Sequence, residues 1–159
     1  MNTPTTAADL IDDSLTRFHE VHRRELPGII RLAREIEAQG GTPALADDLD
    51  QMAEALELHM FKEEMRLFPM MEQGGNTLIR HLIEDMQAEH LAHADAAAGL
   101  QHRVADLVAP AGAEAAGAAL RVAVGKLFDD LRAHMQVEDE RLFPMFGGWS
   151  ANAGQAEES

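Results

Sequence analysis

The sequence contains one twelve-residue pattern twice, 75 residues apart. Residues 59–70 and residues 134–145 both read H-M-x-x-E-[ED]-x-R-L-F-P-M. A histidine pair with the spacing H-x-x-H comes before each copy, at residues 19–22 and 90–93. The chain therefore consists of two similar halves, and in each half an H-x-x-H pair is followed by an H-x-x-x-E pair.

Each half reads as two helices. The long segments are rich in Ala, Leu, Glu, Arg and Met, which favour helices, and apolar residues recur every three or four positions, as from Leu120 to Leu131. Glycine and proline clusters interrupt this pattern between the segments. Because short connections place consecutive helices antiparallel, we predict an all-α fold, an up-down-up-down four-helix bundle. The predicted helices cover residues 6–39, 43–73, 76–109 and 113–146.

Length and composition narrow the class of protein. A chain of 159 residues suggests one domain, and we assign residues 1–149 to the bundle and residues 150–159 to a disordered polar tail. The sequence has no cysteine, so disulfides, thiolate metal sites and cysteine nucleophiles are excluded within it. Its net charge of −15 disfavours nucleic acid as a partner. Because we find no apolar run that would span a membrane and no secretory signal, we expect a cytoplasmic protein.

The two H-x-x-x-E pairs indicate a buried metal site. Residues four apart lie on one face of a helix, so each pair presents an imidazole and a carboxylate to one point in the bundle, where a carboxylate is costly unless it is paired or bound to a metal. In an antiparallel bundle, the first histidine of each H-x-x-H pair falls at the same level, about 20 Å from one end. Such a mixed nitrogen and oxygen ligand set suits iron. The predicted metal ligands are His19, His59, Glu63, His90, His134 and Glu138.

The order of these residues resembles the hemerythrin-like HHE family, and within it the di-iron domain of the repair-of-iron-centres proteins. The resemblance covers about residues 8–147 and rests on Arg17-Phe18-His19, His59-Met60-x-x-Glu63-Glu64, Glu89-His90, and His134-x-x-x-Glu138 with Leu142-Phe143-Pro144. It implies a hemerythrin-like bundle whose cofactor is two non-haem iron ions with a bridging oxo or hydroxo group. The implied assignment is His19 and His134 on one iron, His59 and His90 on the other, and Glu63 and Glu138 as bridges.

The fourth helix offers a second candidate carboxylate ligand. The oxygen-carrying hemerythrins have an H-x-x-x-x-D motif there, and His134 with Asp139 satisfies that spacing. We prefer Glu138 as the ligand, because Glu63 is its counterpart in the first half at the same spacing. Asp139 is then expected to lie beside the site without binding metal.

Three further residues are close to the predicted ligands. His22 and His93 lie about 60° around the helix from the first histidine of each H-x-x-H pair. That offset fits either the rim of the metal site or a solvated boundary position, and we favour the solvated position. Met86, one turn before His90, is expected to line the site rather than to bind metal.

The resemblance implies chemistry with small molecules in the response to nitrosative or oxidative stress. We expect redox chemistry with nitric oxide or reactive oxygen species such as peroxide, which would make the chain an oxidoreductase similar to a nitric oxide reductase or a peroxidase. Electrons would come from a separate, unidentified donor. Reversible binding or sensing of oxygen is the first alternative. Iron donation for iron–sulfur cluster repair is the second, ranked lower because this sequence lacks the Cys-Cys motif that often accompanies the domain in repair proteins.

Overall fold

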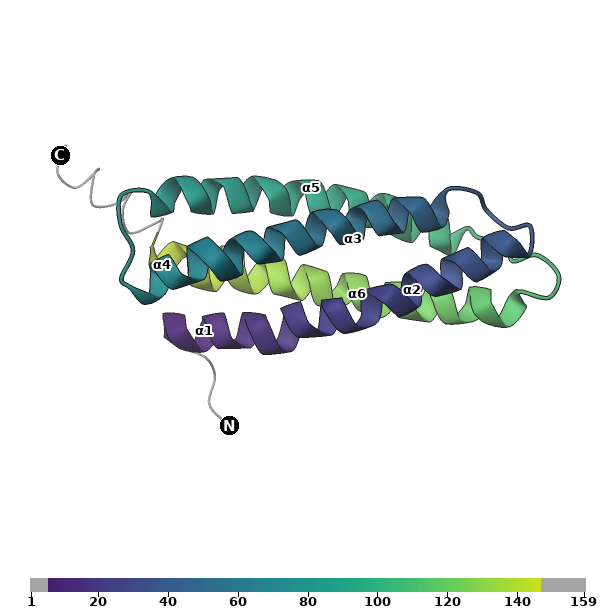
Figure 1. Cartoon of the computed structure of the whole chain (residues 1–159), viewed down its shortest axis with the longest axis horizontal. Helices are drawn as coiled ribbons and strands as arrows, with labels where there is room; N and C mark the ends of the chain where they lie inside the picture. The colour runs from purple at the N-terminus through teal and green to yellow at the C-terminus, as the bar shows by residue number, and fades with distance from the viewer. Residues whose placement is uncertain (1–5, 147–159) are drawn as a thin grey trace.

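The computed structural model of the chain describes residues 6–146, which form an all-α bundle of four helical rods (Figure 1). Consecutive rods run antiparallel, and each rod packs against two others in a ring. The predicted bundle is confirmed, whereas the predicted tail over residues 150–159 lies outside the described residues. The helices are α1, Ala7–Asp13, and α2, Glu20–Ala38, in the first rod; α3, Leu45–Lys62, and α4, Phe68–Glu72, in the second; α5, Ile79–Ala105, as the third; and α6, Glu114–Val137, in the fourth.

Three of the rods contain a π-helical segment. Pro69 follows one of these segments by two positions, and its ring and missing N–H disfavour a regular α-turn there. The N–H of Phe68 instead donates to the carbonyl of Glu63, five residues back, and the equivalent bond occurs before Pro144. Such wide turns are frequent at functional sites. The segments are Ser14–His19 between α1 and α2, Glu63–Leu67 between α3 and α4, and Glu138–Leu142 after α6, which is followed by a short 3₁₀ turn at Phe143–Met145.

Glycines in the left-handed conformation end the first two rods. Gly40 has a φ of 91° and Gly74 a φ of 96°, which L side chains rarely adopt. In each case the next residue, Gly41 or Gly75, donates its N–H to a carbonyl of the last helical turn, at 2.9 and 2.8 Å. These bonds cap the helices, and the two rods therefore end within one residue of the positions predicted from sequence.

The buried apolar side chains form two clusters, separated along the bundle by a polar layer. The larger cluster fills the half near the α2–α3 turn, and the smaller one lies between α1, α4 and the start of α5. Within residues 6–146, no helix is both long and apolar enough to cross a membrane. The buried polar side chains of this part of the chain are Ser14, His19, His22, His59, Glu63, His90, His93, His134 and Glu138.

Candidate metal centre

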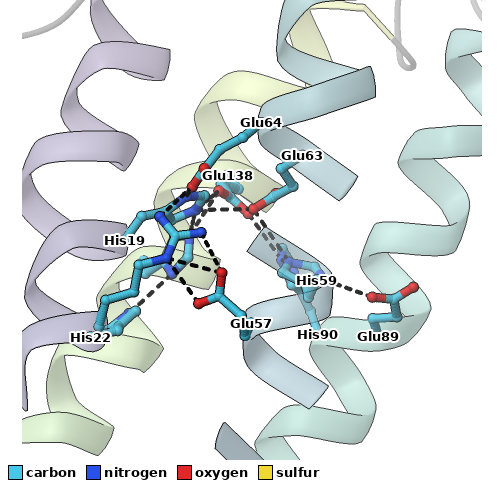
Figure 2. A network of polar contacts seen from close by, with 11 residues as sticks. His19, His22, Glu57, His59, Glu63, Glu64, Glu89, His90 and Glu138 are labelled. Carbon is cyan, nitrogen blue, oxygen red and sulfur yellow. Dashed lines mark hydrogen bonds and ion pairs between the residues drawn. The ribbon is translucent and has the colours of Figure 1, made fainter. Parts of the chain in front are cut away.

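The six predicted ligands meet in the buried polar layer, and all four rods contribute to it. Figure 2 shows His19, His59, Glu63, His90 and Glu138 in this layer. The ligand atoms of the six residues form two groups, and within a group these atoms all lie within 4.8 Å of one another. Because both glutamates belong to both groups, the arrangement is that of two adjacent metal positions with shared carboxylates. One group is His19, Glu63, His134 and Glu138, and the other is His59, Glu63, His90 and Glu138.

Each of the four imidazoles is also held on its far side, through Nδ1. An acceptor at Nδ1 fixes the proton on that nitrogen and directs the lone pair of Nε2 toward the centre, which is how metal-binding histidines are usually oriented. Figure 2 shows one such partner, Glu89, behind His59. The Nδ1 partners are Glu64 for His19 at 2.7 Å, Glu89 for His59 at 2.9 Å, Asp139 for His90 at 2.8 Å, and His22 for His134 at 3.2 Å.

The Nε2 atoms that face the centre approach one another in pairs. His19 Nε2 lies 3.2 Å from His134 Nε2, and His90 Nε2 lies 3.1 Å from His59 Nε2. With the protons on Nδ1, as metal binding requires, the two Nε2 lone pairs of each pair point to one place, where a single cation can bind both nitrogens. Oε2 of Glu63 is also buried without a hydrogen-bond partner. These residues therefore fit a pair of bound metal ions.

The two central carboxyls titrate in opposite directions. Burial raises the pKa of the Glu63 carboxyl well above its usual range, and the nearby Glu138 carboxyl raises it further. Burial acts upward on the pKa of Glu138 as well, but the His134 imidazole and hydrogen bonds from histidines outweigh it and hold this pKa well below its usual range. Burial lowers the pKa of His90, yet the Asp139 and Glu138 carboxylates raise it to about 9. Without metal, the centre thus retains protons where a metal would bring positive charge.

Comparison with known families shows which bundle this is. Residues 10–146 match the model of the hemerythrin HHE cation binding domain. The chain belongs to the hemerythrin HHE family. Relatives of this HHE chain include the iron-sulfur cluster repair protein YtfE of Edwardsiella ictaluri, 33% identical over 135 residues, which are 82% of this chain and 61% of the relative. The YtfE of Cronobacter sakazakii is 33% identical over 142 residues, 86% of this chain and 64% of the relative. The chain therefore spans less than two thirds of the length of these relatives.

Adjacent acids on the fourth rod of the HHE domain occupy different places. Glu138 is fully buried at the centre, whereas Asp139 is 36% exposed at its side chain and contacts Nδ1 of His90. Glu64 is the repeat counterpart of Asp139 and holds His19 in the same way. In both copies of the motif, the first acid of the doublet faces inward and the second orients an imidazole. No role was assigned to Glu64 from the sequence, although the repeated acid doublet was the signal that could have revealed one.

Two phenylalanines of the repeated motif also contact the HHE centre. The ring of Phe68 stacks on His19 with centroids 5.8 Å apart, and the ring of Phe143 stacks on His90 with centroids 5.7 Å apart. Both phenylalanines are buried. The phenylalanine of each L-F-P segment therefore lies against the centre, a role that its sequence alone does not reveal.

His22 and His93 are both buried, so the solvated position favoured from sequence is wrong. Their exposed fractions are 0% and 7%. The stripe of a helix that faces a bundle core is about 100° wide, and an offset of about 60° therefore stays inside it. His22 contacts His134, and the ring of His93 packs edge-on against His59 with centroids 5.1 Å apart. Met86 is buried in the smaller apolar cluster.

An open cavity of about 670 Å³ lies between α3 and α5 of the HHE domain. Its lining includes Glu89 and His93, and both of these residues contact His59. Lys62, also in the lining, forms an ion pair with Glu89. Apolar side chains such as Leu58 complete the wall. The cavity thus ends one contact away from a predicted metal ligand.

Proposed function

We propose that this HHE chain is a non-haem di-iron protein that takes part in the repair of iron–sulfur clusters. The observation that carries the proposal is the pair of overlapping ligand groups, in which four imidazoles and two shared carboxylates are buried together. The process comes from the relatives, which are named iron-sulfur cluster repair proteins. These names favour the second alternative from the sequence analysis, iron donation for cluster repair. Cluster repair is therefore the first function that we propose.

The cofactor in this proposal is two iron ions with a bridging oxo or hydroxo group. Each position would take two imidazole nitrogens and an oxygen from each of the two shared glutamates, a donor set that suits iron. When bound, the iron pair supplies one-electron redox changes at two neighbouring metals and is itself a source of iron. The residues of the chain hold the imidazoles in one orientation through Nδ1 and surround the centre with buried apolar side chains.

Redox chemistry with nitric oxide or reactive oxygen species is the second candidate function. The cavity between α3 and α5 favours it, because its largely apolar wall suits a small uncharged molecule and its inner end reaches the contacts of His59. Two electrons, one from each iron, together with two protons would convert two nitric oxide molecules to nitrous oxide and water. A separate electron donor would then restore the reduced pair.

Cluster repair is tested on an enzyme whose four-iron cluster has been damaged by nitric oxide. The iron-loaded protein, or the same amount of free ferrous iron, is added anaerobically with sulfide, and enzyme activity and cluster absorption are followed. We expect the loaded protein to restore both faster than free iron does. The Glu138→Ala variant, checked for helix content, serves as a control that cannot hold the iron pair. Repair no faster than with free iron contradicts the proposal.

Titration of the diferrous protein with nitric oxide, without a damaged enzyme, separates the two candidates. Nitrous oxide formed at one molecule per two of nitric oxide would support the redox function. A stable nitrosyl complex without nitrous oxide would contradict the redox function and would leave cluster repair as the remaining candidate.

A further inference from the structure

The two metal positions differ in what holds their imidazoles. We define position A by His19 and His134 and position B by His59 and His90, each with the two shared glutamates. The internal repeat relates the two halves of the chain, so equal partners would be expected behind equivalent histidines. The structure departs from this expectation at one of the four imidazoles.

Both imidazoles of position B rest against carboxylates. Glu89 lies 2.9 Å from Nδ1 of His59, and Asp139 lies 2.8 Å from Nδ1 of His90. Lys62 pairs with Glu89 and so holds it in place. A hydrogen bond to a charged acceptor is about twice as strong as one between neutral groups, and it makes the imidazole a stronger donor to metal.

Position A has a carboxylate behind only one of its imidazoles. His19 rests against Glu64, but Nδ1 of His134 lies 3.2 Å from Nε2 of His22. An imidazole that accepts a hydrogen bond is neutral, so His134 lacks the charged partner that its counterpart His59 has. The His22 ring is itself weakly supported, because its Nδ1 is buried without a partner.

The sequence shows why position A lacks the second carboxylate. Glu89 directly precedes His90, and the equivalent residue before His19 is Phe18. The ring of Phe18 lies against His134, with centroids 5.1 Å apart and planes 11° from parallel. At the sequence position where the other half has a carboxylate, this half thus has an apolar ring that covers the face of His134. The acceptor at Nδ1 of His134 comes instead from His22, four residues further along the rod.

We propose that the two metal positions are inequivalent, that position B binds metal more tightly, and that His22 is the positioning residue that leaves position A as the weaker, exchangeable one. This inference rests on the proposed two-metal site. In the context of repair, position A is the position that gives up its iron first. The expected separation is about 10–100-fold in affinity, the effect that partners behind a metal-binding histidine usually have.

The test is an anaerobic titration of the metal-free protein with ferrous iron against a competing chelator, which yields two stepwise dissociation constants. Mössbauer spectra at one and two equivalents of enriched iron report whether the first iron occupies one distinct environment. We expect two constants about 10–100-fold apart in the native chain, and one spectral component at one equivalent.

Four variants assign the difference to residues. Glu89→Gln keeps the shape but removes the charge behind His59, and it should weaken the first constant by roughly tenfold or more. His22→Leu should weaken only the second constant, and His22→Gln, which restores a neutral acceptor, should return it to the native value. His102→Gln is the control, because His102 is an exposed histidine of α5 that pairs with Asp106, away from the centre. Helix content is checked for each variant.

Outcomes against this inference differ from outcomes against the proposed function. Binding of one metal ion or none would remove the two-metal site and with it the proposed function. Two equal constants and two spectral components from the first equivalent would overturn the inference alone. A His22→Leu variant with both constants unchanged, or with only the first one weakened, would overturn the role of His22.

Discussion

Glu138 and Asp139 contact different parts of the centre, although they are neighbours in the sequence. Glu138 belongs to both ligand groups, whereas Asp139 contacts only the far side of His90. We expect Glu138→Ala to lose most of the bound iron, because both positions lose an oxygen ligand. Asp139→Ala should retain most of its iron and lose about 10–100-fold in affinity at one position. Iron per chain after anaerobic loading and desalting measures the difference.

The control for this pair is Asp129→Ala, since Asp129 is an exposed acid on α6 whose side chain pairs with Arg132, away from the centre. It should bind iron like the native chain. An essential Asp139 with a dispensable Glu138 would contradict the assignment and would favour the H-x-x-x-x-D ligand pattern instead.

The sequence predicts which side chains gather at the centre better than it predicts what holds them there. A spacing of four residues fixes a helix face, and for that reason His59 and Glu63 could be placed together in advance. Glu64 is 45 residues from His19, on another rod, and its contact depends on how the two rods are rotated about their axes. No pattern within one helix encodes that rotation, so the partners at Nδ1 emerged only from the packed bundle.

Local helix geometry was only partly predictable. Pro69 and Pro144 indicate a disturbed helix, because proline cannot donate a hydrogen bond one turn back, and π-helical segments occur just before both. The third such segment, Ser14–His19, has no proline nearby in the chain. It places His19 at its end, and nothing in the local sequence distinguishes it from a regular helix.

Arg23 links α2 to the second rod behind the centre. Its Nε donates to Glu57 at 2.9 Å and its Nη1 donates to Glu64 at 2.7 Å, and Glu64 in turn holds His19. We expect Arg23→Gln to speed the release of iron to a chelator by several-fold, because Glu64 loses a fixed partner. The cost in folding stability should be small, about 0–1 kcal/mol, since the pair is partly exposed. Stopped-flow absorption and thermal unfolding measure the two effects.

Arg132→Gln provides the comparison for this change. Arg132 pairs with Asp129 on the exposed surface of α6, away from the centre. Equal release rates from the Arg23 and Arg132 variants would mean that the link between α2 and the second rod does not support the centre.

Metal should stabilise the whole bundle without being required for it. The two apolar clusters lie on either side of the centre, so the metal-free chain should remain helical by circular dichroism. It should nevertheless melt at a clearly lower temperature than the iron-loaded chain, because buried carboxylates and imidazoles are then left without their cation. Equal melting temperatures would show that these residues do not form a coupled metal site.

The metal-free chain should also lose stability as pH falls from about 6.5 to about 5. Imidazoles with a lowered pKa in the folded chain take up protons more readily when the chain unfolds, so acid favours unfolding. His90, whose pKa is raised to about 9, has the opposite effect. Its contribution to folding stability is fully present below about pH 6.5 and is lost as pH rises through 9. The raised pKa of Glu63 also opposes the loss of stability in acid, but this single carboxyl acts against four imidazoles whose pKa is lowered. The imidazoles whose pKa is lowered by burial are those of His22, with a pKa of about 3, His59, with a pKa of about 4, His93 and His134.

Thermal scans of the metal-free chain between these pH values test the balance. A melting temperature that stays constant or rises as pH falls would mean that the buried imidazoles gain protons in the folded chain as easily as in the unfolded one. The buried polar layer would then be open to water.

Metal content tests the central claim most directly. The metal-free chain is loaded anaerobically with ferrous iron alone, desalted and analysed for iron and for zinc. The shared glutamates and paired imidazoles predict close to two iron ions per chain, with charge-transfer absorption in the near ultraviolet after exposure to air. One zinc ion and no iron per chain would contradict the di-iron account.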